Sequence, residues 1–232
     1  VPMDIDAILS QLSGEISTDK KDGDIDMIWI NGENFKTCKE NNMLYGPIAD
    51  ELPNFKSYID TDDEETNADF CFPIEGYEAP YGKAQLVMIA DTAVTPDLPT
   101  NTDEFMEFCK ANKGKVTYPA LPDFTGSAFV RNVIYDICGY EQFMDMEADK
   151  ETVKAAIEPA LEYLRELNPY LWNEGKTFPK DSTALTNMYS DGEVVMDISY
   201  SAYSTATNIE NGTYAETTQS FQFDKGTIGN TN

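Results

Sequence analysis

The sequence predicts an α/β fold whose sheets are largely parallel or mixed. Apolar, β-prone stretches at residues 83–91, 193–200 and 218–224 alternate with segments whose apolar residues recur at helical spacing. Such alternation of strands and helices is typical of α/β folds. The chain has 232 residues, 41% of them apolar, and is long enough for one large domain or two modest lobes with real cores.

The first third of the chain predicts a helix, a strand and a second helix. Apolar residues at helical spacing predict an amphipathic helix between Pro2 and Gly14. The stretch DIDMIWI, residues 24–30, predicts a buried strand, and residues 34–41 predict a helix. The acidic run 60–65 lacks the glycine and the final glutamate of an EF-hand loop, so we expect a solvated loop there.

Further elements follow from the same patterns. Residues 68–74 and 115–120 are β-prone. Helices are predicted at 103–112, with Thr102 or Asp103 as its cap, at 125–139, at 149–168, and at 202–212, where Gly212 closes the helix. Pro159 lies inside the third of these helices and should kink or divide it.

The charge balance excludes two classes of partner. The chain carries 42 acidic and 16 basic residues, which gives a formal charge of -26. This charge repels nucleic acids and anionic membrane surfaces. Because there is neither an apolar run of roughly 20 residues nor a signal peptide at the start, we expect a soluble protein whose export signal is not part of this sequence.

The residues that usually carry catalysis or hold metals are sparse. The sequence contains no histidine, and Cys38, Cys71, Cys109 and Cys138 form no CxxC pair, which argues against a zinc site. We favour free buried thiols over disulfides. Phosphate-loop, dinucleotide and nucleophile-elbow motifs are also missing, and we expect no cofactor. A hydrolase that works with carboxylates alone, such as a glycoside hydrolase, stays open as an alternative.

Five segments occur in an order that carries a family resemblance. They cover most of residues 24–203 and read DIDMIWINGENF, GYEAPYGKAQLVMIAD, KGKVTYPALPDFTGSAFVRNVIYDICG, LNPYLWNEGKTFP and DGEVVMDISYSAY. This series resembles the solute-binding proteins of ABC importers, in extracellular family 1 and its YnjB-like branch. The resemblance implies a non-catalytic receptor that captures a small-molecule solute and delivers it to the membrane permease of an ABC transporter.

The resemblance also implies an architecture and a location. Family members look like two α/β lobes of the type II periplasmic binding protein kind, with mixed sheets and with the solute held between the lobes. We expect residues 1–88 to form a partial lobe 1, 89–220 to form lobe 2, and 221–232 to begin the return crossover. A partial lobe 1 would weaken binding. We expect a monomer outside the cytoplasm, in the periplasm or at the cell surface, where a lipid anchor is one option.

Polar and aromatic residues at the predicted strand ends are the candidate solute contacts, because ligands bind at the carboxyl ends of strands in open α/β sheets. In lobe 1 they are Trp29, Asn31, Glu33, Asn34 and Tyr81; in lobe 2 they are Asp123, Thr125, Gly126, Ser127, Tyr200 and Ser201. The alternative for both stretches is purely structural: a turn with a core tryptophan in the first, and a helix cap in the second.

The chemistry of these residues suits two different kinds of solute. The aromatic side chains with Glu33 and Asp123 suit an organic cation such as thiamine or a polyamine, which relatives of the family bind. The helix start at Thr125 to Ser127 suits a phosphate or a carboxylate. We favour the organic cation.

Overall fold

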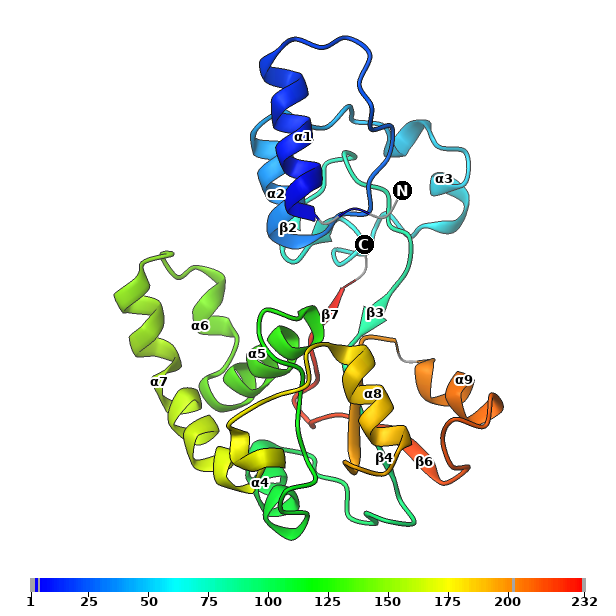
Figure 1. Cartoon of the computed structure of the whole chain (residues 1–232). Helices are drawn as coiled ribbons and strands as arrows, with labels where there is room; N and C mark the ends of the chain where they lie inside the picture. Colours follow the sequence, from blue (N-terminus) through cyan, green and yellow to red (C-terminus); the bar gives the residue numbers. More distant parts are fainter. Residues whose placement is uncertain (1–2, 4, 202, 231–232) are drawn as a thin grey trace. The chain divides into compact units, whose positions relative to one another are not determined.

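A computed structural model describes residue 3, residues 5–201 and residues 203–230 (Figure 1). Pro2 and Ala202, which fall in expected helices, lie outside this range. The described chain divides into two compact units: the first runs up to Lys83 and includes Asn230, and the second is Ala84–Gly229. This division differs from the expected boundaries, because residues 84–88 and 221–229 belong to the second unit.

Helices are the longest regular elements of the first unit. It contains α1 (Ile5–Ser17), α2 (Gly32–Glu40), the 3-10 turn η1 (Ala49–Glu51), α3 (Phe55–Tyr58) and the antiparallel hairpin of β1 (Ala68–Asp69) and β2 (Phe72–Pro73). Phe35 and Cys38 of α2 are fully buried, whereas α1 buries no residue. Helix α1 continues past Gly14, where we had expected it to end. A glycine inside a helix has a modest entropic cost, which this exposed helix tolerates.

The prediction of a buried strand at residues 24–30 was wrong. No described residue of this stretch lies in a strand. Met27 is 91% exposed and Trp29 is 68% exposed, while Ile25, Ile28 and Ile30 are half-buried. A strand needs a neighbouring backbone to accept its hydrogen bonds, and within the described range this stretch pairs with none.

The second unit is built on a three-stranded sheet in the order β5-β4-β6. Its strands are β4 (Val87–Asp91), β5 (Met196–Ser199) and β6 (Thr218–Phe221), and both outer strands run antiparallel to β4. We had expected largely parallel or mixed pairing. A long run of helices separates β4 from β5, and alternation of helices and strands alone does not fix strand direction.

Helices pack around this sheet, and four of them contribute buried residues to its hydrophobic core. They are α4 (Thr102–Ala111), α5 (Phe124–Cys138), α6 (Glu141–Met144), α7 (Lys150–Leu167), α8 (Ser182–Ser190) and α9 (Ser204–Glu210), with 3-10 turns η2 (Asn168–Tyr170) and η3 (Trp172–Gly175). The ring of Phe105 lies 5.6 Å from Phe129 and 6.1 Å from Phe223, centroid to centroid. These aromatic contacts tie α4 and α5 to the segment after β6.

Several local predictions needed correction. Residues 115–120 form no strand: the Val116 carbonyl accepts the Trp172 N–H and the Ala120 N–H donates to the Pro179 carbonyl, so these groups do not pair with a neighbouring strand. Asn101, rather than Thr102 or Asp103, caps α4 and accepts the Glu104 N–H at 2.9 Å.

Two other expectations had mixed outcomes. Pro159 lies within α7 without dividing it, since it is on the exposed face where water can reach the carbonyl that it leaves free. Gly212, with φ +73°, follows the end of α9 as predicted. The four cysteines are free in the structure, but only Cys38 and Cys109 are buried, whereas Cys138 is half-buried and Cys71 is exposed.

The two units are connected through short strands. β3 (Ala84–Gln85) pairs with β7 (Gly229–Asn230) in a separate two-stranded sheet, and the Leu86 N–H donates to the Ile228 carbonyl at 2.8 Å. Within the described ranges, no helix is both long and apolar enough to cross a membrane.

Candidate functional site

The start of α2 carries the predicted contacts of unit 1. Asn31 is the N-cap residue and has extended backbone (φ -160°, ψ 167°), yet its side chain forms no capping hydrogen bond. Gly32 follows with φ +59°, a conformation that glycine adopts without strain. Gly32 thus provides the turn that is the structural alternative for this stretch, and within the described chain the Asn31 side chain does not cap α2.

Trp29 and Tyr81 form an aromatic pair in the same unit. Their ring centroids lie 4.8 Å apart at an interplanar angle of 62°, an edge-to-face geometry. Trp29 is 68% exposed and Tyr81 is 82% exposed. Trp29 is therefore not a core residue, and the pair presents ring faces to solvent that a flat or cationic group can contact.

Glu33 and Asn34 lie in the first turn of α2. Glu33 is exposed and Asn34 is half-buried. Phe35, the next residue, is fully buried and packs edge-on against Phe72 at 6.0 Å between centroids. The change from exposed to buried across these three residues separates the candidate contacts Glu33 and Asn34 from the core residue Phe35.

Two carboxylates are buried in unit 1, one of them in contact with the start of α2, and the sequence predicted neither. Asp69 is fully buried, and one of its oxygens accepts the Gly32 N–H. Glu78 is 8% exposed, and neither residue forms an ion pair in the described chain. Burial raises the pKa of both groups; for Glu78 burial and the nearby Asp69 raise the pKa to about 8. Nothing in the sequence around either acid marks it as buried.

The start of α5 carries the predicted contacts of unit 2. An oxygen of Asp123 accepts the Gly126 N–H at 2.9 Å, so Asp123 is the cap, and the Ser127 N–H bonds to the Asp123 carbonyl at 2.8 Å. The amides of Phe124 and Thr125 form no hydrogen bond within the described chain. Thr125 is only 7% exposed.

Gly126 has a packing role. A Cβ at this position would lie 2.1 Å from the Pro119 carbonyl oxygen. We had predicted Gly126 as a small residue that lets a solute approach the backbone. The close Pro119 carbonyl explains the glycine without a solute, and Gly126 is buried.

Tyr200 and Ser201 follow β5. The Tyr200 ring lies 4.9 Å from the ring of Phe124, the first residue of α5. Its hydroxyl is buried and has no hydrogen-bond partner among the described residues, and burial raises the pKa of Tyr200 to about 12. Ser201 is exposed, and its N–H donates to the Ser199 hydroxyl at 3.1 Å.

The predicted residues thus form two local groups. In unit 1, Trp29 and Tyr81 touch, and Asn31, Glu33 and Asn34 follow directly on α2. In unit 2, the Phe124–Tyr200 ring contact links the α5 start to the end of β5. Phe124 was not predicted, because an aromatic residue at a helix start resembles any partly exposed packing residue.

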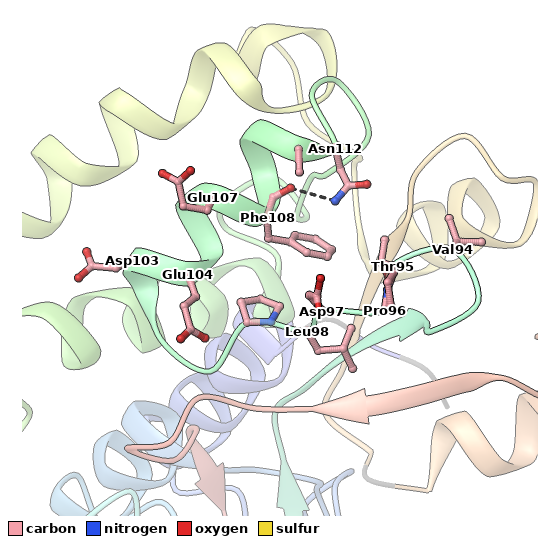
Figure 2. Close-up of a pocket in the computed structure, with 12 residues that line it drawn as sticks. Val94, Thr95, Pro96, Asp97, Leu98, Asp103, Glu104, Glu107, Phe108 and Asn112 are labelled. Atoms are coloured by element: carbon pink, nitrogen blue, oxygen red, sulfur yellow. Dashed lines mark hydrogen bonds between the residues drawn. The ribbon is translucent and has the colours of Figure 1, made fainter.

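A pocket of about 590 Å³ lies elsewhere in unit 2 and contains none of the predicted residues. It is bounded by the loop 94–99 and by one face of α4, as Figure 2 shows. Two of its carboxylates have local partners: Glu104 accepts from Thr100, and Glu107 accepts from Lys110. Glu104 therefore serves the α4 cap, and Glu107 forms a surface pair.

Solved structures define the fold class. The chain matches the solved structure of a provisionally named extracellular solute-binding protein from Bordetella parapertussis, with a TM-score of 0.67 and 13% identity. This match covers 100% of this chain and 63% of that one. It also matches the spermidine/putrescine substrate-binding protein PotD of Streptococcus pneumoniae with a TM-score of 0.55 and 11% identity. This match covers 95% of this chain and 57% of PotD. The fold is that of type II periplasmic binding proteins, as expected.

The sequence itself defines the family. Residues 1–225 match the model of bacterial extracellular solute-binding proteins, and the chain belongs to this family. It is 37% identical to the protein YnjB of Escherichia coli K12 over 211 residues, which are 91% of this chain and 54% of YnjB. The chain thus spans about half the length of that relative. The family consists of solute-binding proteins rather than enzymes, which removes the hydrolase alternative.

Proposed function

We propose that this chain acts in an extracytoplasmic receptor of an ABC importer, which captures a small organic solute and presents it to a membrane permease. Membership in the extracellular solute-binding family supports the proposal. The single observation that carries it is the solvent-exposed Trp29–Tyr81 pair, followed by Asn31, whose side chain makes no capping hydrogen bond within the described chain. Exposed aromatic pairs cost hydrophobic free energy unless a ligand covers them.

The proposed solute carries a cationic group. Edge-to-face aromatic rings that expose their faces attract ammonium and other cations, and the carboxylate of Glu33 lies one residue beyond the turn that follows Trp29. The formal charge of -26 raises the local concentration of cations and speeds their encounter. Two of the fold neighbours are named as spermidine/putrescine proteins; at 11% and 14% identity they support the fold only.

The proposed receptor uses both groups of residues. Trp29, Asn31, Glu33, Asn34 and Tyr81 provide the cation contacts in unit 1, and the residues at the α5 start with Tyr200 and Ser201 provide contacts in unit 2. The proposal further includes a monomer in the periplasm or at the cell surface, where a lipid anchor is one option.

A thermal-shift screen of the full chain against organic solutes tests the proposal. A solute that binds the native state raises the melting temperature as its concentration exceeds its dissociation constant. We expect cationic solutes to give the largest shifts, and Tyr81→Ala to abolish them. Tyr58→Ala is the matched control, because Tyr58 is equally exposed at 81% and lies in the same unit. Equal loss in both variants, or hits confined to neutral solutes, would contradict the proposal.

A further inference from the structure

We infer that the pocket between the loop 94–99 and α4 is a binding site for a compact organic amine, a molecule that carries an ammonium group on an apolar body. The pocket lies within unit 2 and contains none of the proposed solute contacts, so this site goes beyond the proposed function and does not depend on it. Its volume of about 590 Å³ falls within the roughly 300–1,000 Å³ that are typical of small-molecule sites.

The loop that forms one wall of the pocket is fixed at both ends. At its start, the Thr95 N–H donates to the Asp91 carbonyl at 2.8 Å. At its end, the Thr100 carbonyl accepts the Asp224 N–H at 2.7 Å. Two prolines restrict the backbone between these points. A wall that is ordered before a ligand arrives reduces the entropic cost of binding.

One face of α4 forms the other wall. Its lining residues come in two rows at a spacing of four: Asp103, Glu107 and Ala111, and Glu104, Phe108 and Asn112. This spacing places both rows on the same side of the helix. Phe108 is only 6% exposed, and its ring points from α4 toward the loop (Figure 2). On the loop, Val94 is 62% exposed. Together they offer apolar surface that a ligand can cover.

The side-chain donors of the lining are engaged, whereas two carboxylates are free. The Thr95 hydroxyl and the Asn112 amide each donate to a backbone carbonyl, at 3.1 Å and 2.9 Å. Asp97 and Asp103 are exposed, and neither side chain forms a hydrogen bond or an ion pair with a described residue. A ligand in this pocket therefore meets free acceptors, which favour a group that donates hydrogen bonds.

The local charge favours a cation. Four acidic residues line the pocket, and none of the described residues that line it is basic. Lys110, the basic residue of α4, pairs with Glu107 at 2.7 Å and lies 5.8 Å from the centre of the Tyr170 ring. The resulting negative potential attracts ammonium groups and repels carboxylates and phosphates. Apolar surface and free carboxylates in one pocket thus fit an amine with an apolar body.

Four matched probes separate the two parts of this ligand. Phenethylamine carries an ammonium group on a phenyl ring. Both 2-phenylethanol and phenylacetate keep the ring, but the first is neutral and the second is anionic, whereas ethylamine keeps the ammonium group without the ring. Each probe is titrated into the full chain at constant ionic strength, and the amide NMR shifts of Val94, Leu98 and Ala111 report binding at the pocket.

Three variants locate the binding. Asp97→Asn removes one free carboxylate, and Ala111→Phe fills the pocket without removing a charge. Asp145→Asn is the matched control, because Asp145 is another exposed acid of unit 2 and lies outside the pocket. The unliganded melting temperature of each variant reports its folding.

Phenethylamine should shift the pocket amides and bind roughly tenfold or more tightly than ethylamine, because only phenethylamine covers apolar surface. Asp97→Asn should weaken its binding roughly threefold, as expected for an exposed ion pair. Ala111→Phe should abolish the shifts, and Asp145→Asn should leave them unchanged. Trp29→Ala should also keep them, since Trp29 belongs to unit 1.

Equal binding of phenethylamine, 2-phenylethanol and phenylacetate would overturn the site, because the pocket would then not select a cation. Equal weakening by Asp97→Asn and Asp145→Asn would overturn it too, because the overall charge would then attract the amine. Shifts confined to amides of α2 would leave the proposed function standing and the pocket without this ligand. If only the peptide acetyl-Leu-Lys-Leu-amide shifted the pocket amides, the pocket would belong to a protein partner and not to a small amine.

Discussion

The backbone N–H of Gly32 donates a hydrogen bond to the buried carboxylate of Asp69. Gly32 lies between Asn31 and Glu33, two of the proposed solute contacts, and has a positive φ of +59°. Asp69 lies in the β1–β2 hairpin, 37 residues further along the chain. This long-range contact holds the turn that presents the contacts, although Asp69 itself is fully buried.

Loss of the Asp69 carboxylate should therefore loosen the start of α2. Asp69→Ala leaves the buried Gly32 N–H without an acceptor, which costs on the order of 1–3 kcal/mol. Hydrogen exchange of the Gly32 amide should accelerate in this variant, while amides in the sheet of unit 2 keep their rates. Unchanged exchange at Gly32 would mean that Asp69 does not hold the turn.

The pH dependence of stability should report Glu78. Its pKa is about 8 in the folded protein and near 4.5 when unfolded, so the folded state retains a proton that the unfolded state releases. This contribution to stability is complete below pH 4.5 and is lost as the pH rises to about 8, at about 1.4 kcal/mol per pH unit. The charged groups that act on this pair are Asp69, beside Glu78, and Glu33, beside Asp69.

Glu78→Gln isolates this effect, because glutamine keeps the shape of the protonated acid and does not titrate. Urea midpoints measured from pH 5 to pH 8 should fall less steeply for the variant than for the unchanged protein. The variant should also be the more stable of the two at pH 8. Parallel pH profiles would show that Glu78 is ionised in the folded state across this range.

Gly126 offers a test of packing in unit 2. The Pro119 carbonyl would lie 2.1 Å from a new Cβ, so Gly126→Ala should destabilise the unit by about 3 kcal/mol or more. Gly14 is the matched control, since a Cβ there meets no atom within 4 Å and the residue lies inside α1. Gly14→Ala should stabilise α1 by roughly 0.5–1 kcal/mol. Thermal unfolding of the two variants checks both signs.

Local patterns were sufficient for much of the fold. The apolar spacing of α4, α5 and α7 and the β-prone run at β4 follow from residues close in sequence. The stretch 24–30 failed because Met27 and Trp29, both apolar, face solvent rather than a neighbouring strand. Periodicity identifies apolar residues but does not reveal which of them a fold, or a proposed ligand, covers.

For the candidate site, too, local sequence patterns predicted some features and missed others. The Asn31 turn and the Asp123 cap were accessible to local rules for caps and turns. Burial of Asp69 and Glu78 depends on how the hairpin and the following loop pack, which no local signal contains. Likewise, the reason for a glycine at position 126 is the distant carbonyl of Pro119.

In the proposed receptor, the exposed Trp29–Tyr81 pair and the neighbouring carboxylate of Glu33 bind the solute. The most direct test of this proposal uses the cationic solute that binds most strongly in the screen. Calorimetry gives its dissociation constant for the unchanged chain and for Trp29→Ala, Glu33→Gln and Tyr58→Ala. The proposal predicts at least roughly tenfold weaker binding for Trp29→Ala, a smaller loss for Glu33→Gln, and no change for Tyr58→Ala. Unchanged affinity in Trp29→Ala and Glu33→Gln, with the fold intact, would contradict it.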